Sequence, residues 1–487
     1  MTLLRRSRIP LLVVAFGLLW LVGAGRTSAA KPPLGSGDFS PGVLVAWYPN
    51  STVVTTLLFV AYIAAALGVL IGLWQTPRRV AHWGLVAFVG ATALLAGPIG
   101  SADHINYAAY GRIAMGGADP YVESPIKWRD GLDPVAGAVQ APWQDTPSVY
   151  GPVATAFQSL SSALGGDNLR DTVWVWQWLI VLAWLAVRWL LLQVASTDDL
   201  RRRVDVLWTF NPLVFATLVL GAHVDLLAGA FVLAALWAMH RNPVATGVFV
   251  GAAFATKVTY GVVLLAVLWA WRSVDRSQFG QRAARLAAGF ALVVVPAYVI
   301  AGPHVLRQLK AAGGSFSYAS PWSPVIRGLR HFMPEWGVTT IVFVLAAALM
   351  IGFAWVGYGL VHRLGLADGV TDGATREAVT LTFVLMTAYV LLAPYSLPWY
   401  DAVTWMLLPL LVPFVWDAIL VVRHLFMTLA YAPGRAVGIA PSVQDWTLGF
   451  RSNVTPYVCW ASLLALAAVA WRGSSARASS SEPTPHP

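Results

Sequence analysis

Residues 53–74 read VVTTLLFVAYIAAALGVLIGLW and contain no charged side chain. Each residue of a helix adds about 1.5 Å, so this segment extends over roughly 33 Å and crosses the ~30 Å hydrocarbon layer of a bilayer. Apolar segments of about 17 to 24 residues recur along the rest of the chain. The sequence therefore predicts an all-α integral membrane protein, a polytopic bundle of hydrophobic helices.

The overall composition supports the same fold class. Hydrophobic residues make up 58% of the 487 residues, charged residues only 11%, and the mean hydropathy is +0.66. A soluble globule of this size needs more polar surface than these residues supply. The formal net charge of +10 comes from short arginine clusters between apolar segments, which indicates membrane topology and no nucleic-acid partner.

We expect about 13 transmembrane helices, within a range of roughly 11 to 14, because that many apolar segments approach the length of a span. The candidate spans are residues 9–23, 53–74, 83–100, 172–195, 206–220, 224–239, 244–256, 261–271, 286–302, 338–361, 378–393, 402–422 and 454–471. They form one transmembrane domain over residues 1–472, followed by a Ser- and Pro-rich segment, 473–487, with the composition of a disordered tail. The residues 423–452 fit either another crossing or a surface segment, which leaves the C-terminus unplaced.

The N-terminal segment fits two interpretations. Arg5, Arg6 and Arg8 precede an apolar stretch and then a group of small residues at 28–30. This order is typical of a cleavable signal peptide, but it also suits a retained first membrane helix, which we favour. The single cysteine, Cys459, lies in an apolar segment, so it excludes an intrachain disulfide and is expected to be a buried filler.

The distribution of arginine predicts the orientation of the bundle. Cytoplasmic loops of membrane proteins carry an excess of Lys and Arg. With the N-terminus inside, this excess falls on one set of connections, whereas the opposite loops are longer and less basic. The basic connections contain Arg78, Arg79, Arg201, Arg202, Arg203, Arg241, Arg272, Arg276, Arg282, Arg285, Arg363 and Arg376. The large outer loops are then residues 26–52, 101–171 and 303–337.

The outer loop 101–171 is too long for a passive connection, since most helix connections are shorter than about eight residues. At its start, Asp103, Tyr107 and Tyr110 have the i, i+4, i+7 spacing of one helix face. A carboxylate beside aromatic rings suits a sugar, which has polar edges and an apolar face. The alternative is a short interfacial helix, of the kind expected elsewhere in this loop, with Asp103 as its cap.

Other polar and aromatic residues fall on the same side of the membrane under this topology. They are Tyr150, His223, Asp225, Lys257, Trp399 and Tyr400. Each has a structural explanation on its own, as a turn residue, a helix cap, a snorkelling lysine or part of an aromatic belt. Because such features normally divide between both faces, we predict a binding or active site at the outer interface.

Taken in chain order, these motifs resemble the membrane-embedded glycosyltransferases of the GT-C class. The closest resemblance is to the actinobacterial polyprenol-phosphate-mannose-dependent alpha-1,6-mannosyltransferases that build lipomannan and lipoarabinomannan. The motifs that carry it are Asp103 with Tyr107, residues 117–121 (Gly-Ala-Asp-Pro-Tyr), 149–152 (Val-Tyr-Gly-Pro), 211–213 (Asn-Pro-Leu) and 221–225 (Gly-x-His-x-Asp), then Lys257 and 398–400 (Pro-Trp-Tyr). The chain departs from the family pattern at Ile105 and Val224, which leaves the exact sugar and acceptor open.

The resemblance implies a transferase at the outer face of the plasma membrane that uses a polyprenyl-phosphate sugar and a glycolipid or glycan acceptor. It implies that Asp103 is the catalytic carboxylate. A phosphate-linked sugar already has a good leaving group, so one base suffices, and we expect Asp103 to deprotonate the acceptor while the anomeric centre inverts. Lys257 and Arg112 are expected to offset charge on the departing lipid phosphate. Tyr107, Tyr110, Tyr150, His223, Asp225, Trp399 and Tyr400 are expected to contact sugar or acceptor.

Two further hypotheses remain. A GT-C transferase with another polyprenyl-phosphate sugar, such as an arabinofuranosyl donor, has the same requirements. A lipid-linked sugar flippase or other transporter predicts short loops on both faces and charged residues near mid-membrane, whereas here the polar residues gather at one end. No P-loop or Rossmann glycine motif is present for a nucleotide sugar, and the sequence identifies no cofactor and no metal ligands.

Overall fold

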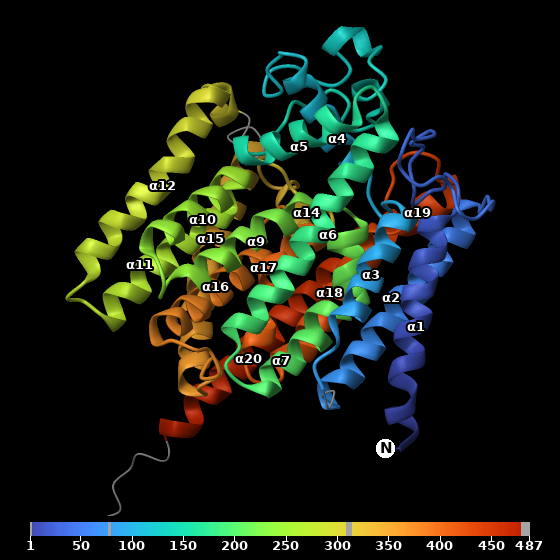
Figure 1. Cartoon of the computed structure of the whole chain (residues 1–487). Helices are drawn as coiled ribbons and strands as arrows, with labels where there is room; N and C mark the ends of the chain where they lie inside the picture. The colour runs from blue at the N-terminus through green and yellow to red at the C-terminus, as the bar shows by residue number, and fades with distance from the viewer. Residues whose placement is uncertain (1, 76–78, 308–313, 479–487) are drawn as a thin grey trace, which may run out of the picture.

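The computed structural model describes residues 2–75, 79–307 and 314–478, and every named element within these ranges is a helix (Figure 1). By length and composition, seven of these helices can cross a membrane. They are α1 (Thr2–Ala24), α2 (Ser51–Trp74), α6 (Leu169–Val194), α12 (Phe279–Ala301), α15 (Glu335–Arg363), α16 (Gly373–Leu392), and α19 (Pro441–Asn453) continued by α20 (Thr455–Ala478). The predicted all-helical membrane fold is confirmed at this level, although thirteen spans are not.

An eighth span is possible where two helical segments meet at a bend of 43°. The first segment is α7 (Asp198–Val204) with η3 (Asp205–Thr209), and the second is α8 (Pro212–Val214) with η4 (Phe215–Leu220). Pro212 lacks a backbone N–H, and the side chain of Asn211 accepts hydrogen bonds from the amides of the next turn. The Asn-Pro-Leu motif therefore produces a break in the middle of the predicted span 206–220.

Four apolar helices are shorter than the hydrocarbon layer of a membrane is thick. They are α3 (Trp83–Ala96), α9 (Val224–Ala238), α10 (Pro243–Thr256), and α11 (Val263–Val274) preceded by η5 (Val258–Val262). Each is packed among longer helices, and α9 is almost completely buried. A helix of 15 residues extends over only about 22 Å, so its end lies below the rim of a bundle built to span ~30 Å. The polar residues at the adjoining ends of α9 and α10 are accordingly buried or nearly buried, since His223 and Asp225 are 1% exposed and Lys257 is 15% exposed.

The span predicted at 402–422 is wrong. Helix α17 (Ala402–Leu407) and η7 (Leu408–Leu410) end at a turn that contains Pro413, and α18 (Trp416–Tyr431) then runs back along α2. Proline cannot continue a helix, so the apolar run divides into two antiparallel pieces. The ambiguous residues 425–431 are the last turns of α18.

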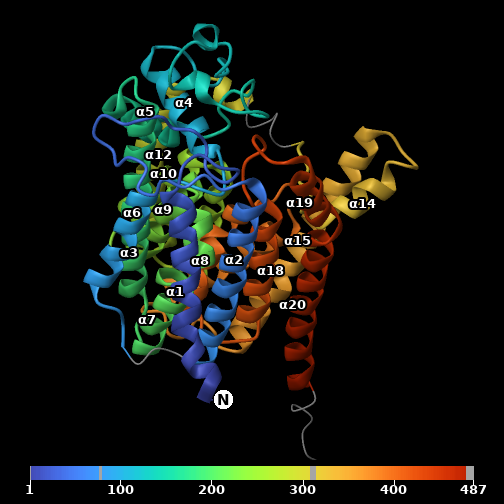
Figure 2. The same cartoon turned by 90° about the vertical axis from the view of Figure 1, so that its right-hand side faces the viewer.

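The polar loops and the chain ends lie at opposite ends of the bundle (Figures 1 and 2). Loop 101–171 forms a cap with α4 (Asp103–Met115), η1 (Trp128–Gly131), η2 (Ala136–Ala138) and α5 (Pro152–Gly165). Helix α1 begins at the other end, where α7 with its three arginines lies and where α20 ends. This arrangement agrees with the predicted separation of basic and polar connections, except that Arg78 lies outside the described residues.

The structure corrects two expectations, about the cap and about the tail, and adds a helix in the outer loop 303–337. Helix α4 is buried by α5, η2 and α6, so it is not an interfacial surface helix. Loop 303–337, described except for 308–313, contains α14 (Trp322–Leu329). Helix α20 continues to Ala478, so the predicted disordered tail 473–487 begins as helix; its residues 479–487 lie outside the described ranges.

Candidate functional site

Helix α4 begins at Asp103, whose backbone N–H donates to the Ser101 hydroxyl at 3.0 Å. The Asp103 carboxylate keeps 17% of its surface exposed, and its Oδ2 lies 3.6 Å from Nδ1 of His223. One helical turn later, the Tyr107 hydroxyl lies 3.4 Å from the same nitrogen. The predicted face of α4 therefore turns its carboxylate and its first tyrosine toward His223.

His223 is held by an unusual turn at the start of α9. Ala222, just before it, has a φ of +53°, a conformation that non-glycine residues rarely adopt. The Ala222 carbonyl accepts a hydrogen bond of 2.7 Å from Nε1 of Trp176 in α6, which holds the turn in place. Strain of this kind at a cleft residue is typical of functional sites.

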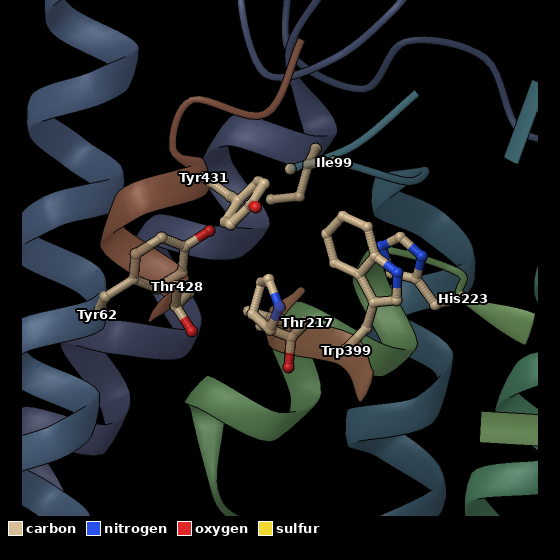
Figure 3. A pocket seen from close by; sticks show the side chains of 11 residues that line it. Tyr62, Ile99, Thr217, His223, Trp399, Thr428 and Tyr431 are labelled. Carbon is tan, nitrogen blue, oxygen red and sulfur yellow. The ribbon is translucent and has the colours of Figure 1, made fainter. Parts of the chain in front are cut away.

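The imidazole of His223 is stacked on the indole of Trp399. The two rings are 3.8 Å apart at 11°, and Figure 3 shows them side by side. Trp399 belongs to η6 (Pro398–Asp401), which comes more than 170 residues later in the chain. Both rings also line a cavity of about 20 Å³, enough for one water molecule and too small for a sugar.

A second charged group lies beside the first. Nζ of Lys257, at the end of α10, lies 2.6 Å from Oδ1 of Asp225, and the Tyr260 hydroxyl donates to the same oxygen at 2.9 Å. Asp225 is 1% exposed, whereas Lys257 retains 15%. The ammonium also lies 3.6 Å from the centre of the Tyr400 ring, a cation–π contact. Lys257 is thus a partly open cation with a buried counter-ion.

Three tyrosines line the approach to Asp103. The ring of Tyr150 lies 5.2 Å from that of Tyr107 and 6.4 Å from that of Tyr110. The hydroxyl of Tyr110 donates to the Thr146 carbonyl at 2.9 Å, which ties the cap loop to α4. Aromatic rings beside a carboxylate provide apolar faces and polar edges, the combination on which the sequence prediction rested.

The Val-Tyr-Gly-Pro motif, residues 149–152, brings the cap against α10. The amide of Gly151 donates to the Thr256 carbonyl at 3.0 Å, directly beside Lys257. A Cβ at Gly151 would collide with the backbone carbonyl of Ala255, so only glycine permits this approach. This motif, which the sequence alone suggested to be a turn, therefore sets the distance between Tyr150 and Lys257.

The protonation of these groups follows from their burial. Burial raises the pKa of Asp103 from 3.8 to about 6; the Ser101 hydroxyl and Lys257 oppose this shift and the negative charge of Asp225 adds to it. Burial lowers the pKa of His223 well below 6.5, so the imidazole is neutral. Burial also lowers the pKa of Lys257, while Asp225 works in the opposite direction. The Asp103 carboxylate therefore binds its proton more tightly than an exposed aspartate does.

Arg112 does not join this site. Its Nε lies 3.1 Å from Asp133, and its guanidinium also pairs with Asp167, away from His223 and Lys257. Nine positions separate it from Asp103, which puts the two side chains on opposite faces of α4. A role in binding the donor phosphate does not fit this location, because the guanidinium is directed toward Asp133 and Asp167 and away from Asp103.

The structure adds residues that the sequence analysis did not select. Tyr260 completes the pairing of Asp225, and its position three residues after Lys257 was the available signal. Asp401, behind Trp399, forms a buried cluster with Arg423 at 2.5 Å and His424 at 3.0 Å. No local pattern connects these residues, because the partners lie on α18, which the sequence had not separated from the preceding segment.

A larger cavity of about 700 Å³ opens beside the site, between the cap and the end of α12. Thr155 of α5 lines it, and the hydroxyls of Thr155 and Tyr121 lie 2.8 Å apart. At its rim, Nδ1 of His304 lies 2.7 Å from Asp119. Ile300, in the last turn of α12, also lines this cavity and is 87% exposed. The cavity therefore borders a surface that faces lipid in a membrane.

Among the described residues, no group of three or more His, Cys, Asp or Glu side chains is arranged to hold a metal ion. The single thiol, Cys459, is buried, as expected, and it contacts Met427 in the helical core at 3.7 Å. The candidate site therefore consists of one partly exposed carboxylate, one partly exposed cation and an aromatic wall.

Comparison with known proteins confirms the resemblance inferred from the order of the motifs. Residues 11–273, more than half of the chain, match the family described as "Alpha-(1->6)-mannopyranosyltransferase, N-terminal domain". The chain is 25% identical to alpha-(1->6)-mannopyranosyltransferase A of Mycobacterium tuberculosis, over 64% of this chain and 61% of the relative. It is 28% identical to "Probable alpha-(1->6)-mannopyranosyltransferase" of Mycolicibacterium smegmatis, over 76% and 63%.

A third relative is alpha-(1->6)-mannopyranosyltransferase B of Corynebacterium glutamicum. It is 25% identical over 46% of this chain and 38% of its own length. The chain thus spans less than two thirds of the length of the curated relatives it matches. The family match extends from α1 through α11, so it includes Asp103, His223, Asp225 and Lys257 but not Trp399.

Proposed function

We propose that this chain, which belongs to the alpha-(1->6)-mannopyranosyltransferase family, transfers a mannosyl residue from polyprenyl-phosphate mannose to a glycolipid or glycan acceptor. The observation that carries this proposal is the proximity of two unlike groups, a carboxylate and an ammonium, at the start of α4 and the end of α10. Asp103 is a carboxylate with a raised pKa, and Lys257 is a partly exposed ammonium within its electrostatic reach. A base and a cation side by side are what the transfer of a phosphate-linked sugar requires.

In the proposed reaction, Asp103 takes the proton of the acceptor hydroxyl, and the acceptor oxygen bonds to the anomeric carbon. The bond between that carbon and the phosphate oxygen breaks on the opposite side, so the anomeric centre inverts. The bond electrons leave with the polyprenyl phosphate, and Lys257 offsets the charge that this phosphate gains. His223, stacked on Trp399 and in contact with Tyr107, is proposed to position the carboxylate, which lies 3.6 Å from its Nδ1.

The lipid donor is supported by the large cavity between α5 and α12. Its lipid-facing wall offers a lateral approach for a polyprenyl chain, and α5 leads from it to Gly151, beside Lys257. Tyr110, Tyr150 and Tyr400 are proposed to contact the mannose and acceptor rings, since sugar faces stack on aromatic side chains. Asp225 is proposed to act through Lys257, because it is almost completely buried.

The function is tested with membranes from a host that lacks alpha-1,6-mannosyltransferases and expresses this chain. We expect transfer of labelled mannose from polyprenyl-phosphate mannose to a synthetic alpha-1,6-mannoside with an alkyl tail. The product should be sensitive to an alpha-1,6-specific mannosidase. A panel of donors should include GDP-mannose, with synthesis of the lipid donor blocked, and a polyprenyl-phosphate arabinofuranose. Efficient use of either in place of the lipid-linked mannose contradicts the assignment of the donor.

We propose that the site faces the outside of the plasma membrane, and cysteine labelling predicts a clear pattern. Leu132 in the cap is 84% exposed, whereas Arg276 lies in the connection between α11 and α12, at the end of α12 away from the cap. Leu132→Cys should react with a membrane-impermeant maleimide in intact cells, whereas Arg276→Cys should react only after permeabilisation. The parent chain is the background control because Cys459 is 1% exposed. The reverse pattern overturns the orientation.

A further inference from the structure

A separate groove lies between α1 and α3, on the side of the bundle seen in Figure 2. It has a volume of about 610 Å³ and is lined mainly by apolar side chains. Ile9 and Val13 of α1 face Leu85 and Phe88 of α3 across it. These four side chains are between 52% and 71% exposed, so the bundle itself does not fill the groove.

The length of the groove matches one leaflet of a bilayer. Arg8 and Trp20, both in its lining, are twelve positions apart on α1 and therefore separated by about 18 Å along the helix. Half of the hydrocarbon layer is roughly 15 Å thick. An acyl chain that enters from the end where α1 begins thus fits the groove along its whole length.

Positive charge gathers at that same end. Arg8, Arg79 and Asp205 line the groove, and Arg188 pairs with Asp205 at 3.2 Å. Arg8 and Arg188 therefore share one carboxylate, and Arg79 adds a third cation to the lining. Nε of Arg8 and Nη1 of Arg188 are buried and have no hydrogen-bond partner among the described residues. Buried donors without partners are costly, so they indicate a missing acceptor.

We propose that this groove binds one anionic glycerophospholipid from the leaflet in which α1 begins. Its phosphodiester would accept hydrogen bonds from Arg8 and Arg79, and an acyl chain would pack between α1 and α3. The excess of arginine on cytoplasmic loops explains why cations occur at this end, but it does not explain a leaflet-long apolar groove below them. The groove is distinct from the candidate donor site, because Lys257 lies toward the other end of the bundle.

Gly17 allows the groove to be filled without altering the charges. It lines the groove, and a Cβ built there meets no atom within 4 Å, so Gly17→Leu puts an isobutyl group into the space intended for the acyl chain. Gly352→Leu is the matched control, since Gly352 lies on helix α15 with equally open surroundings. Both changes favour helix, so neither is expected to prevent folding.

The test is native mass spectrometry of the full chain titrated with phosphatidylglycerol or phosphatidylcholine of the same acyl composition. We expect the parent and Gly352→Leu to bind one phosphatidylglycerol at least about tenfold more tightly than phosphatidylcholine. Gly17→Leu should lose most of this binding. The double variant Arg8→Ala/Arg79→Ala should lose the preference for the anionic lipid. Its control is Arg272→Ala/Arg276→Ala, which removes the same charge from the end of the bundle away from the cap. This control variant should retain the preference.

Three outcomes overturn the proposal. One is equal binding of the two phospholipids to the parent. Another is binding by Gly17→Leu that matches the binding by Gly352→Leu. The third is displacement of phosphatidylglycerol by equimolar polyprenyl phosphate, which would assign the groove to the sugar carrier. None of these readouts depends on transferase activity, so the result is independent of the proposed function.

Discussion

Asp103→Asn is expected to reduce mannosyl transfer by about 10²- to 10⁴-fold, the range over which a positioned general base contributes to a rate. The amide has the shape of the carboxylate but cannot take the proton of the acceptor. The apparent affinity for the donor should change little, because donor binding is assigned to Lys257 and the aromatic wall. The measurement is kcat and kcat/KM with labelled polyprenyl-phosphate mannose in detergent or membranes.

The pH dependence of the parent enzyme gives this prediction a second readout. Only the ionised carboxylate is a base, and burial raises the pKa of Asp103 to about 6. The rate should therefore be constant at higher pH and fall tenfold per unit as the pH drops below about 6, not below 3.8. The residual activity of Asp103→Asn should lack this acid limb.

Asp145→Asn is the matched control for Asp103→Asn. Asp145 is exposed in the same cap loop, so the same chemical change there removes a charge and leaves the residues of the candidate site unchanged. We expect its activity to be within about twofold of the parent, since surface substitutions of this kind are nearly neutral. Asp103→Asn activity equal to that of Asp145→Asn would exclude the base assignment.

Lys257→Met is expected to lower kcat/KM for the lipid donor by about 10²- to 10³-fold, the effect of removing one preorganised charge from a transition state. The variant has a second consequence, because it leaves Asp225 buried with Tyr260 as its remaining partner. Breaking one side of a buried ion pair costs about 3–5 kcal/mol of stability. A loss of activity by Lys257→Met alone therefore does not distinguish phosphate binding from misfolding.

The double variant Asp225→Asn/Lys257→Met separates the two effects. It removes both charges of the pair, so the melting temperature should return most of the way toward that of the parent. Donor use should remain low, because no cation then faces the phosphate. The apparent KM for acceptor should change far less than that for donor. Recovery of donor use in the double variant would mean that Lys257 serves only to neutralise Asp225.

Element prediction succeeded where a helix is both long and apolar. The predicted span 53–74 corresponds to α2 (Ser51–Trp74), and the predicted span 172–195 corresponds to α6 (Leu169–Val194). Composition alone is enough to predict helices of this length and hydrophobicity. Element prediction failed at 402–422, where an equally apolar run turns back on itself inside the bundle. Burial against protein and burial against lipid select the same residue types, so hydropathy does not distinguish a span from a turn within the core.

The same limit applies to the candidate site, where local spacing was predictable and contacts between distant residues were not. The spacing of Asp103, Tyr107 and Tyr110 correctly identified one face of a helix, because helical periodicity is a local property. Arg112 was grouped with Lys257 by charge, although it lies on the opposite face and pairs with two carboxylates. The partner of a charge depends on residues far away in the chain, and a single sequence does not record those contacts.

The sequence by itself determined that this protein is a membrane bundle, which of its ends is basic, and to which family it belongs. These properties follow from composition, charge distribution and motif order, all of which are read along the chain. Only the tertiary structure decided that His223 stacks on Trp399, that Asp225 pairs with Lys257, and that both pairs lie beside Asp103 within the bundle. The physical reason is that a site is made from distances between helices, and packing sets those distances.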